Sequence, residues 1–123
     1  MMNSSENDKN TFISYFKKKV KNFVRERNWS NYHTPKNLIQ ALGIEIAELS
    51  ELFLFKEYSV NEILKNKSLF ESISDELADI LIYLISLVNC LRIDLTKSFN
   101  KKMEKNERKY PIKEFNNGKY YKK

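Results

Sequence analysis

Two pairs of acidic residues in this sequence have the spacing of one helical turn. Glu45 precedes Glu48 by three residues, and Glu76 precedes Asp79 by the same interval. At about 100° per residue, the two members of each pair lie within roughly 60° of each other on a helix and share one face. Apolar residues flank both pairs, so we expect these carboxylates to be partly buried. Partly buried carboxylates repel one another unless they are protonated or bridged by a cation.

The ligand type indicates which cation would fit. Donor sets made only of oxygen match Mg²⁺, with Mn²⁺ as the other possibility. A di-iron site of the ferritin type requires two Glu-x-x-His motifs, whereas this chain has one histidine, His33, outside any such motif. Acidic residues three apart are also common on solvated helix faces, and spacing alone leaves that interpretation open.

Glycine and proline, the residues that tight turns most often need, are scarce in this chain. The 123 residues include two glycines and two prolines, too few for a β-sandwich or for a glycine-rich phosphate loop. Apolar residues recur instead at intervals of three and four, which is typical of amphipathic helices. The pattern predicts an all-α fold, a four-helix bundle. The long helices are expected at residues 11–28, 35–56, 69–91 and 95–109, with a short helix near 60–64.

Two residues have the character of helix N-caps. Thr34 stands before Pro35, which is favoured in a first helical turn, and Asp94 precedes the fourth predicted helix. The helix at 69–91 is the longest and most apolar, so we expect it to be central. The predicted organisation is a disordered N-terminus (1–10), a single helical domain (11–111) and a basic C-terminal tail (112–123).

The positive charge of the chain is concentrated in its C-terminal segment. Residues 97–123 carry 10 basic and 3 acidic side chains, so the whole net charge of +6 arises there. This segment could contact a phosphorylated molecule, bind nucleic acid or only keep the protein in solution.

A single cysteine, Cys90, cannot form an internal disulfide, and we expect it to be a small buried apolar residue. We expect a cytoplasmic protein with no membrane segment.

Ordered blocks of residues resemble the MazG-related all-α nucleoside triphosphate pyrophosphohydrolases, most closely the dCTP pyrophosphatase branch. Together they cover about residues 20–111. The blocks are Glu26-Arg27-Asn28-Trp29, Tyr32-His33, Pro35, Asn37-Leu38, Ala41-Leu42, the run 45–53, the run 76–84, Lys102-Met103-Glu104, Asn106 and Lys109-Tyr110-Pro111.

The resemblance implies an enzyme that uses Mg²⁺ to cleave a nucleoside triphosphate into the monophosphate and pyrophosphate, in nucleotide pool housecleaning. The metal ligands it implies are Glu45, Glu48, Glu76 and Asp79. The catalytic residues it implies are Glu48, Glu51 and Lys102, with Glu51 as a supporting acid or general base. The substrate-binding residues it implies are Trp29, His33, Asn37, Phe55, Tyr83, Lys102, Asn106, Lys109 and Tyr110.

Two positions depart from the pattern of this branch. Phe55 stands where dCTP-specific members tend to have Trp, and Val20 stands where a substrate-contacting His can be found. We therefore expect a preference for dCTP or a modified dCTP, with shallow discrimination among bases. The resemblance also implies a homo-oligomer, a tetramer or a dimer, and no obligate nucleic acid.

Plainer interpretations stay open at several of these positions. Trp29 could be a core anchor, His33 a hydrogen-bonded loop residue, Tyr83 an aromatic at the edge of the core, and Glu51 a merely exposed acid. For the whole protein, the alternative is a non-enzymatic basic helical module that binds nucleic acid through its C-terminal tail. That alternative gives no reason for the four carboxylates.

Overall fold

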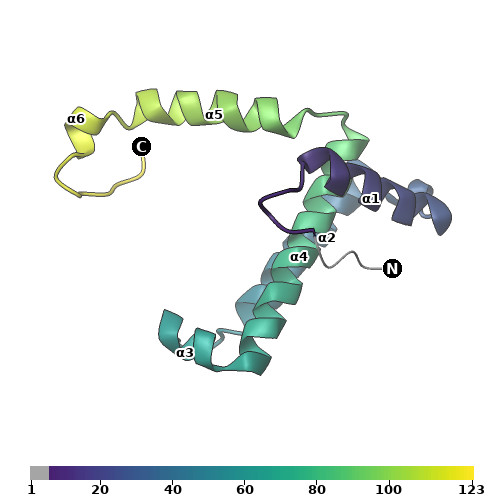
Figure 1. Cartoon of the computed structure of the whole chain (residues 1–123), viewed down its shortest axis with the longest axis horizontal. Coiled ribbons are helices and arrows are strands. Elements are labelled where there is room, and N and C mark those ends of the chain that lie inside the picture. The colour runs from purple at the N-terminus through teal and green to yellow at the C-terminus, as the bar shows by residue number, and fades with distance from the viewer. Residues whose placement is uncertain (1–5) are drawn as a thin grey trace. The chain divides into compact units, whose positions relative to one another are not determined.

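The computed structural model describes residues 6–123 (Figure 1). Within these residues there are six α-helices, one 3₁₀ turn and no strand, so the all-α prediction is confirmed. The helices are α1 (Ile13–Glu26), α2 (Pro35–Glu51), α3 (Val60–Lys65), α4 (Lys67–Cys90), α5 (Leu95–Lys109) and α6 (Ile112–Phe115), and the 3₁₀ turn η1 is Ser30–Tyr32.

The chain divides into two compact units. One ends at Arg92 and contains α1 to α4, and the other runs from Ile93 to Lys123. Residues 1–5 of the predicted disordered N-terminus lie outside the described residues. Among the helices of the described part, none has the length and apolar character needed to cross a membrane.

Helix α4 is the central element of the first unit, as predicted. It packs against α1, α2 and α3, and Figure 1 shows α2 alongside it and α1 across its later turns. The side chain of Asn89 ties α4 to α1 by donating to the carbonyl oxygen of Lys17 at 3.0 Å. The buried apolar side chains are few: Val20 on α1, Leu38 on α2, and Ile85 and Val88 on α4.

Side-chain caps define where the helices begin. The hydroxyl of Thr34 accepts from the backbone N–H of Asn37 at 3.2 Å, and Asp94 accepts from that of Lys97 at 3.0 Å, so both predicted N-caps are confirmed. Asn66 caps α4 in the same way, which places its first residue two positions before the predicted start.

Helix α2 ends earlier than predicted, at Glu51. Leu52 and Phe53 donate to carbonyl oxygens three residues back, a tightening that is common where a helix terminates. The chain then turns at Phe55, which has a positive φ of 57°. The ring of Phe53 packs edge-on against Tyr58 at 5.6 Å between centroids, which stabilises this bend.

The second unit consists of α5, α6 and the segment after them. The predicted tail is not featureless, because α6 begins at Ile112 directly after Pro111. After α6 the chain folds back toward the end of α5, as the yellow trace in Figure 1 shows. The backbone N–H of Lys123 donates to the hydroxyl of Tyr110 at 3.0 Å and closes the segment.

Candidate functional site

Helices α2 and α4 bring three of the four predicted metal ligands together. One carboxylate oxygen each from Glu45, Glu76 and Asp79 lie within 4.8 Å of one another. Glu45 and Glu76 are half-buried, and Asp79 is exposed. Glu48 lies outside this group of three but interacts with both Glu45 and Glu76. The four acids therefore form one connected cluster at the contact between the two helices.

The cluster is electrostatically frustrated. Desolvation, together with hydrogen bonding to Glu48 and Glu76, raises the pKa of Glu45 to about 7. Desolvation and the charges of Glu48 and Asp79 also raise the pKa of Glu76. The Oε2 atoms of Glu45 and Glu76 are buried without a hydrogen-bond partner among the described residues. Each of these oxygens has an unused lone pair that water does not reach.

This donor set fits a divalent cation. A buried carboxylate oxygen without a partner is costly, and a cation placed among the three carboxylates would satisfy the two orphaned oxygens at once. All the donors are carboxylate oxygens, the ligands preferred by hard cations such as Mg²⁺ and Mn²⁺. In the described part of the chain, no Lys or Arg forms an ion pair with any of the four acids.

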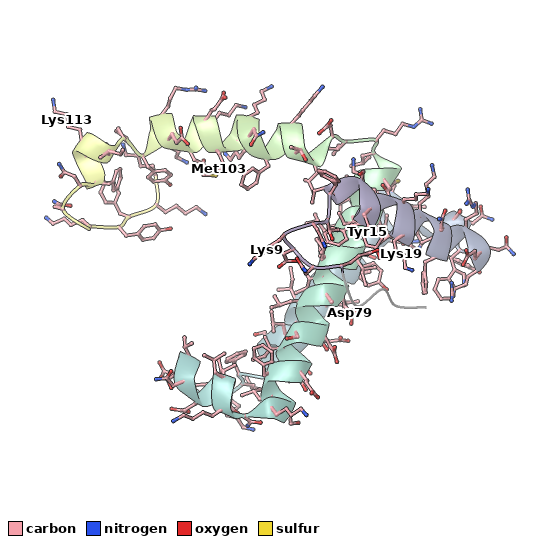
Figure 2. The ribbon with its side chains drawn as sticks, viewed as in Figure 1. Lys9, Tyr15, Lys19, Asp79, Met103 and Lys113 are labelled. Carbon is pink, nitrogen blue, oxygen red and sulfur yellow. The ribbon has the colours of Figure 1, made fainter. Side chains whose placement is uncertain are left out.

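A cavity of about 480 Å³ opens beside the acids. It brings three predicted substrate-binding residues, Trp29, His33 and Tyr83, into one lining with Glu45 and Asp79. Two of the lining residues are labelled in Figure 2: Asp79 on α4 and Lys19 on α1. The full lining is Lys19, Val20, Phe23, Val24, Trp29, His33, Glu45, Asp79, Ile82, Tyr83 and Ser86.

Aromatic rings form one wall of this cavity. Phe23 and Trp29 meet edge to face with 5.8 Å between centroids, and the guanidinium of Arg27 stacks over Phe23 at 3.8 Å. The turn that presents Trp29 passes through Asn28, which has a positive φ of 56°. Asn tolerates this conformation better than most residues. The arrangement offers a ring surface to a flat ligand near the carboxylates.

Lys19 and Phe23 line this cavity but carry no clear functional signal in the sequence. Phe23 follows Val20 and Phe16 at intervals of three and seven, an apolar stripe on α1 that is typical of a core face, yet it is 45% exposed and lines the cavity. Lys19 lies off that stripe and had no signal beyond its charge. Which face of α1 meets the acids depends on how α1 crosses α4, and the sequence does not specify that crossing.

Among the predicted site residues of the first unit, three lie outside both the acidic cluster and the lining of this cavity: Asn37, Glu51 and Phe55. Phe55 is 98% exposed, and Glu51 is exposed one turn beyond Glu48. Asn37 donates through its side-chain amide to the carbonyl oxygen of Tyr32 at 3.0 Å. That bond ties the end of η1 to the first turn of α2 and so helps to position His33.

Cys90 differs from its predicted environment. It was expected to be buried, but it is exposed. It is the last residue of α4, where its thiol donates to the carbonyl oxygen of His33 at 3.5 Å. The helix end leaves one side of the residue open to solvent.

The remaining predicted substrate-binding residues belong to the second unit. Lys102, Asn106, Lys109 and Tyr110 line a cavity of about 560 Å³. Spacings of three and four place the first three on one face of α5. These residues are therefore brought together as a group of their own.

Protein without bound metal should lose stability as the pH rises. The pKa of Glu45 is about 7 in the folded state against an ordinary value of 4.5. Between these values the folded state binds more protons than the unfolded chain, so the free energy of unfolding should fall across this window and level off above it. Glu45→Gln should flatten this part of the profile, measured by thermal unfolding in EDTA. Glu71→Gln, the same change at an exposed position of α4, should not.

Mg²⁺ should reverse this loss. At about pH 8 it should raise the unfolding temperature of the wild type and of Glu71→Gln more than that of Glu45→Gln, because a ligand of the folded state stabilises it. A wild-type unfolding temperature that changes with neither pH nor Mg²⁺ would contradict the assignment of these acids as a cation site.

Comparison with known proteins identifies the family. The sequence profile of the MazG-like family matches residues 41–123. The chain is 38% identical over 91 residues to dCTP pyrophosphatase 1 of Bos taurus, covering 73% of this chain and 54% of that protein. It is 37% identical over 97 residues to dCTP pyrophosphatase 1 of Homo sapiens, covering 72% and 53%. The chain thus spans about half the length of these relatives.

A solved structure extends the agreement to the fold. The crystal structure of a pyrophosphatase from Archaeoglobus fulgidus superposes with a TM-score of 0.73 at 34% identity, covering 90% of this chain and 99% of that one. The predicted resemblance and the predicted fold type are confirmed, and the chain belongs to the MazG-like family.

Proposed function

We propose that this protein is a Mg²⁺-dependent nucleoside triphosphate pyrophosphohydrolase that produces a nucleoside monophosphate and pyrophosphate, with Mn²⁺ as a possible substitute. One observation carries the proposal: Glu45 and Asp79, which fit a divalent cation, line the same cavity as Trp29 and Tyr83. The names of the mammalian relatives and of the archaeal structure support a nucleotide polyphosphate as substrate. A cytoplasmic location stays a prediction.

The carboxylates would hold the cation, with Glu48 joining Glu45, Glu76 and Asp79. When bound, Mg²⁺ would neutralise charge on the phosphate oxygens and make a water molecule more acidic. Glu48 or Glu51 would accept the proton from the attacking water, because both are exposed carboxylates on the same helix as Glu45. Lys102 and Lys109 would hold the phosphate chain by charge-assisted hydrogen bonds.

The aromatic wall would bind the base. Trp29 and Phe23 offer ring surfaces, and His33 and Tyr83 offer polar groups in the same lining. A pyrimidine deoxynucleotide, with dCTP or a 5-modified dCTP as the leading candidate, agrees with the names of the relatives. Phe55, exposed in one chain, would complete the base pocket from a second copy.

We also propose a homo-oligomer, a dimer or a tetramer. Phe70, Leu77 and Leu81 recur at intervals of seven and four on α4 and form one exposed apolar stripe, and Ile39 and Ile46 form another on α2. Apolar stripes of this kind, on helices with few buried side chains, are typical of surfaces that pair with another subunit.

Hydrolysis with Mg²⁺ should release monophosphate and pyrophosphate, never diphosphate and orthophosphate, when products from a panel of nucleoside triphosphates are separated. Asp79→Asn should lower the rate at least about 100-fold, because it removes a proposed metal ligand. In EDTA the variant should unfold no earlier than the wild type, since repulsion in the cluster is relieved. Asp75→Asn, an exposed Asp on the same helix, should keep full activity. Full activity of Asp79→Asn would exclude the proposed ligand set.

The wild type should sediment as a dimer or tetramer in analytical ultracentrifugation. Leu77→Asp, in the middle of the α4 stripe, should shift it toward the monomer, because it places a charge in the paired surface. Leu64→Asp changes an exposed Leu of α3 outside the stripe and should not shift it. A wild-type monomer that is fully active would argue against the proposed assembly.

Phe55 should affect substrate binding more than the chemical step. Loss of a stacked ring costs about 1 to 3 kcal/mol, so Phe55→Ala should raise KM for every substrate about tenfold with a smaller change in kcat. Phe55→Trp should sharpen the preference for cytosine because Trp offers more stacking area. Phe12→Ala, at another highly exposed Phe, is the control. An unchanged KM in Phe55→Ala would rule out a role for Phe55 in base binding.

A further inference from the structure

The segment after α6 is fastened as a loop, and we call residues 116–123 the C-terminal loop. The ammonium group of Lys123 pairs with Glu114 at 2.7 Å, and its backbone N–H donates to the hydroxyl of Tyr110. The hydroxyl of Tyr121 donates to the other carboxylate oxygen of Glu114. Gly118, with a φ of 79°, adopts the left-handed conformation that reverses the chain.

Three aromatic rings pack inside this closure. The centroids of Tyr110 and Phe115 lie 5.4 Å apart, and those of Phe115 and Tyr121 lie 4.9 Å apart. Such ring pairs contribute favourably beyond the apolar area that they bury. The C-terminal loop is thus anchored at its far end by an ion pair, hydrogen bonds and ring contacts, all within the second unit.

The closure adds two lysines to the cavity of α5. Lys119 and Lys122 of the C-terminal loop line the same space of about 560 Å³ as Lys102 and Lys109 of the helix. Asn106, Tyr110, Phe115 and Tyr120 complete the lining, which contains no acidic residue. Four lysines and three aromatic residues therefore line one space.

The nearby acids do not neutralise this space. Glu114 is engaged by Lys123 and Tyr121, and hydrogen bonds from those two side chains lower its pKa. Glu104 and Glu107 belong to α5 but follow Lys102 by two and five residues, intervals that turn them away from the face bearing Lys102, Asn106 and Lys109. The lysines repel one another unless an anion of several charges lies among them.

The chemistry of the lining selects a polyphosphate. Ammonium groups bind phosphate oxygens as point charges, and a chain of phosphates can reach several of them at once. The aromatic residues in the lining suit a ligand that also carries a ring. A cavity of about 560 Å³ has the size of a site for one small molecule, which favours a nucleotide over a continuous strand of nucleic acid.

We propose that Lys119 and Lys122 of the C-terminal loop bind the phosphate chain of the nucleoside triphosphate together with Lys102 and Lys109. The inference rests on the proposed function for the identity of the ligand. It assigns a binding role to residues 116–123, which sequence alone presents as a basic tail. The match of the family profile through residue 123 agrees with a role for this segment in the domain.

Calorimetric titration with Mg²⁺ present tests the assignment, using the non-hydrolysable α,β-imido analogue of dCTP, dCMP and a single-stranded oligonucleotide. Lys119→Ala/Lys122→Ala should weaken binding of the analogue about tenfold or more, as expected for lost charge-assisted bonds, and that of dCMP less than about threefold. The control Lys97→Ala/Lys113→Ala removes two exposed lysines of α5 and α6 that do not line the cavity. In Figure 2, Lys113 points away from the C-terminal loop. Lys119→Arg/Lys122→Arg should retain affinity.

The outcomes separate this inference from the proposed function. Failure of the wild type to release pyrophosphate from any triphosphate would remove the function, whereas lysine-dependent binding of the analogue would still support the site. Equal affinities of the loop variant and the control for the analogue would overturn the inference. The inference would also be overturned if Lys119→Ala/Lys122→Ala lost equal affinity for dCMP and for the analogue, or lost affinity for the oligonucleotide alone.

Discussion

Repulsion among carboxylates on α2 and α4 is the constraint on which the site depends. The two helices pack along their apolar sides, and that packing holds Glu45, Glu76 and Asp79 within 4.8 Å of one another although their charges oppose it. Desolvation first, and then hydrogen bonds to Glu48 and Glu76 and the charges of Glu48 and Asp79, raise the pKa of Glu45, so the folded protein favours the protonated acid over the ionised one. Such a site favours cation binding, because a bound cation reduces the repulsion among the carboxylates that the helix contact holds together.

Helix α4 meets this constraint because its acids and its apolar residues lie on different sides. Ile85 and Val88 are buried against the neighbouring helices, while Glu76, Asp79 and Tyr83 occupy another side at intervals of three and four. The exposed stripe of Phe70, Leu77 and Leu81 continues the side that bears Val88, because Leu81 precedes Val88 by seven residues. The buried core and the uncovered apolar surface are therefore successive parts of one side of this 24-residue helix, and the acids lie on the other side.

Local signals made much of the fold predictable. The caps at Thr34 and Asp94 and the periodic apolar residues act within a few positions of sequence, and the predicted bounds of α5 agree with the structure. The acidic pairs were equally visible, because helical spacing alone places their members on one face. Lys19 and Phe23 were not predictable, since they reach the cavity through the crossing of α1 over α4. The exposed positions of Phe55 and Cys90 likewise depend on where α2 and α4 end, not on the hydrophobicity of the residues themselves.

The acidic cluster of the first unit and the lysines that line the second unit's cavity carry opposite charges. The chain has 22 basic residues and a net charge of +6, and the ion pairs in the part that the structure describes include Arg27 with Glu26 and Lys123 with Glu114. Neither involves the acids of the cluster, and neither involves the lysines that line the cavity of the second unit. Opposite charges that formed pairs with each other would satisfy themselves and attract no ligand. Because neither set forms an ion pair within the part of the chain that the structure describes, the acids of the first unit can attract a cation and the lysines of the second unit a polyanion.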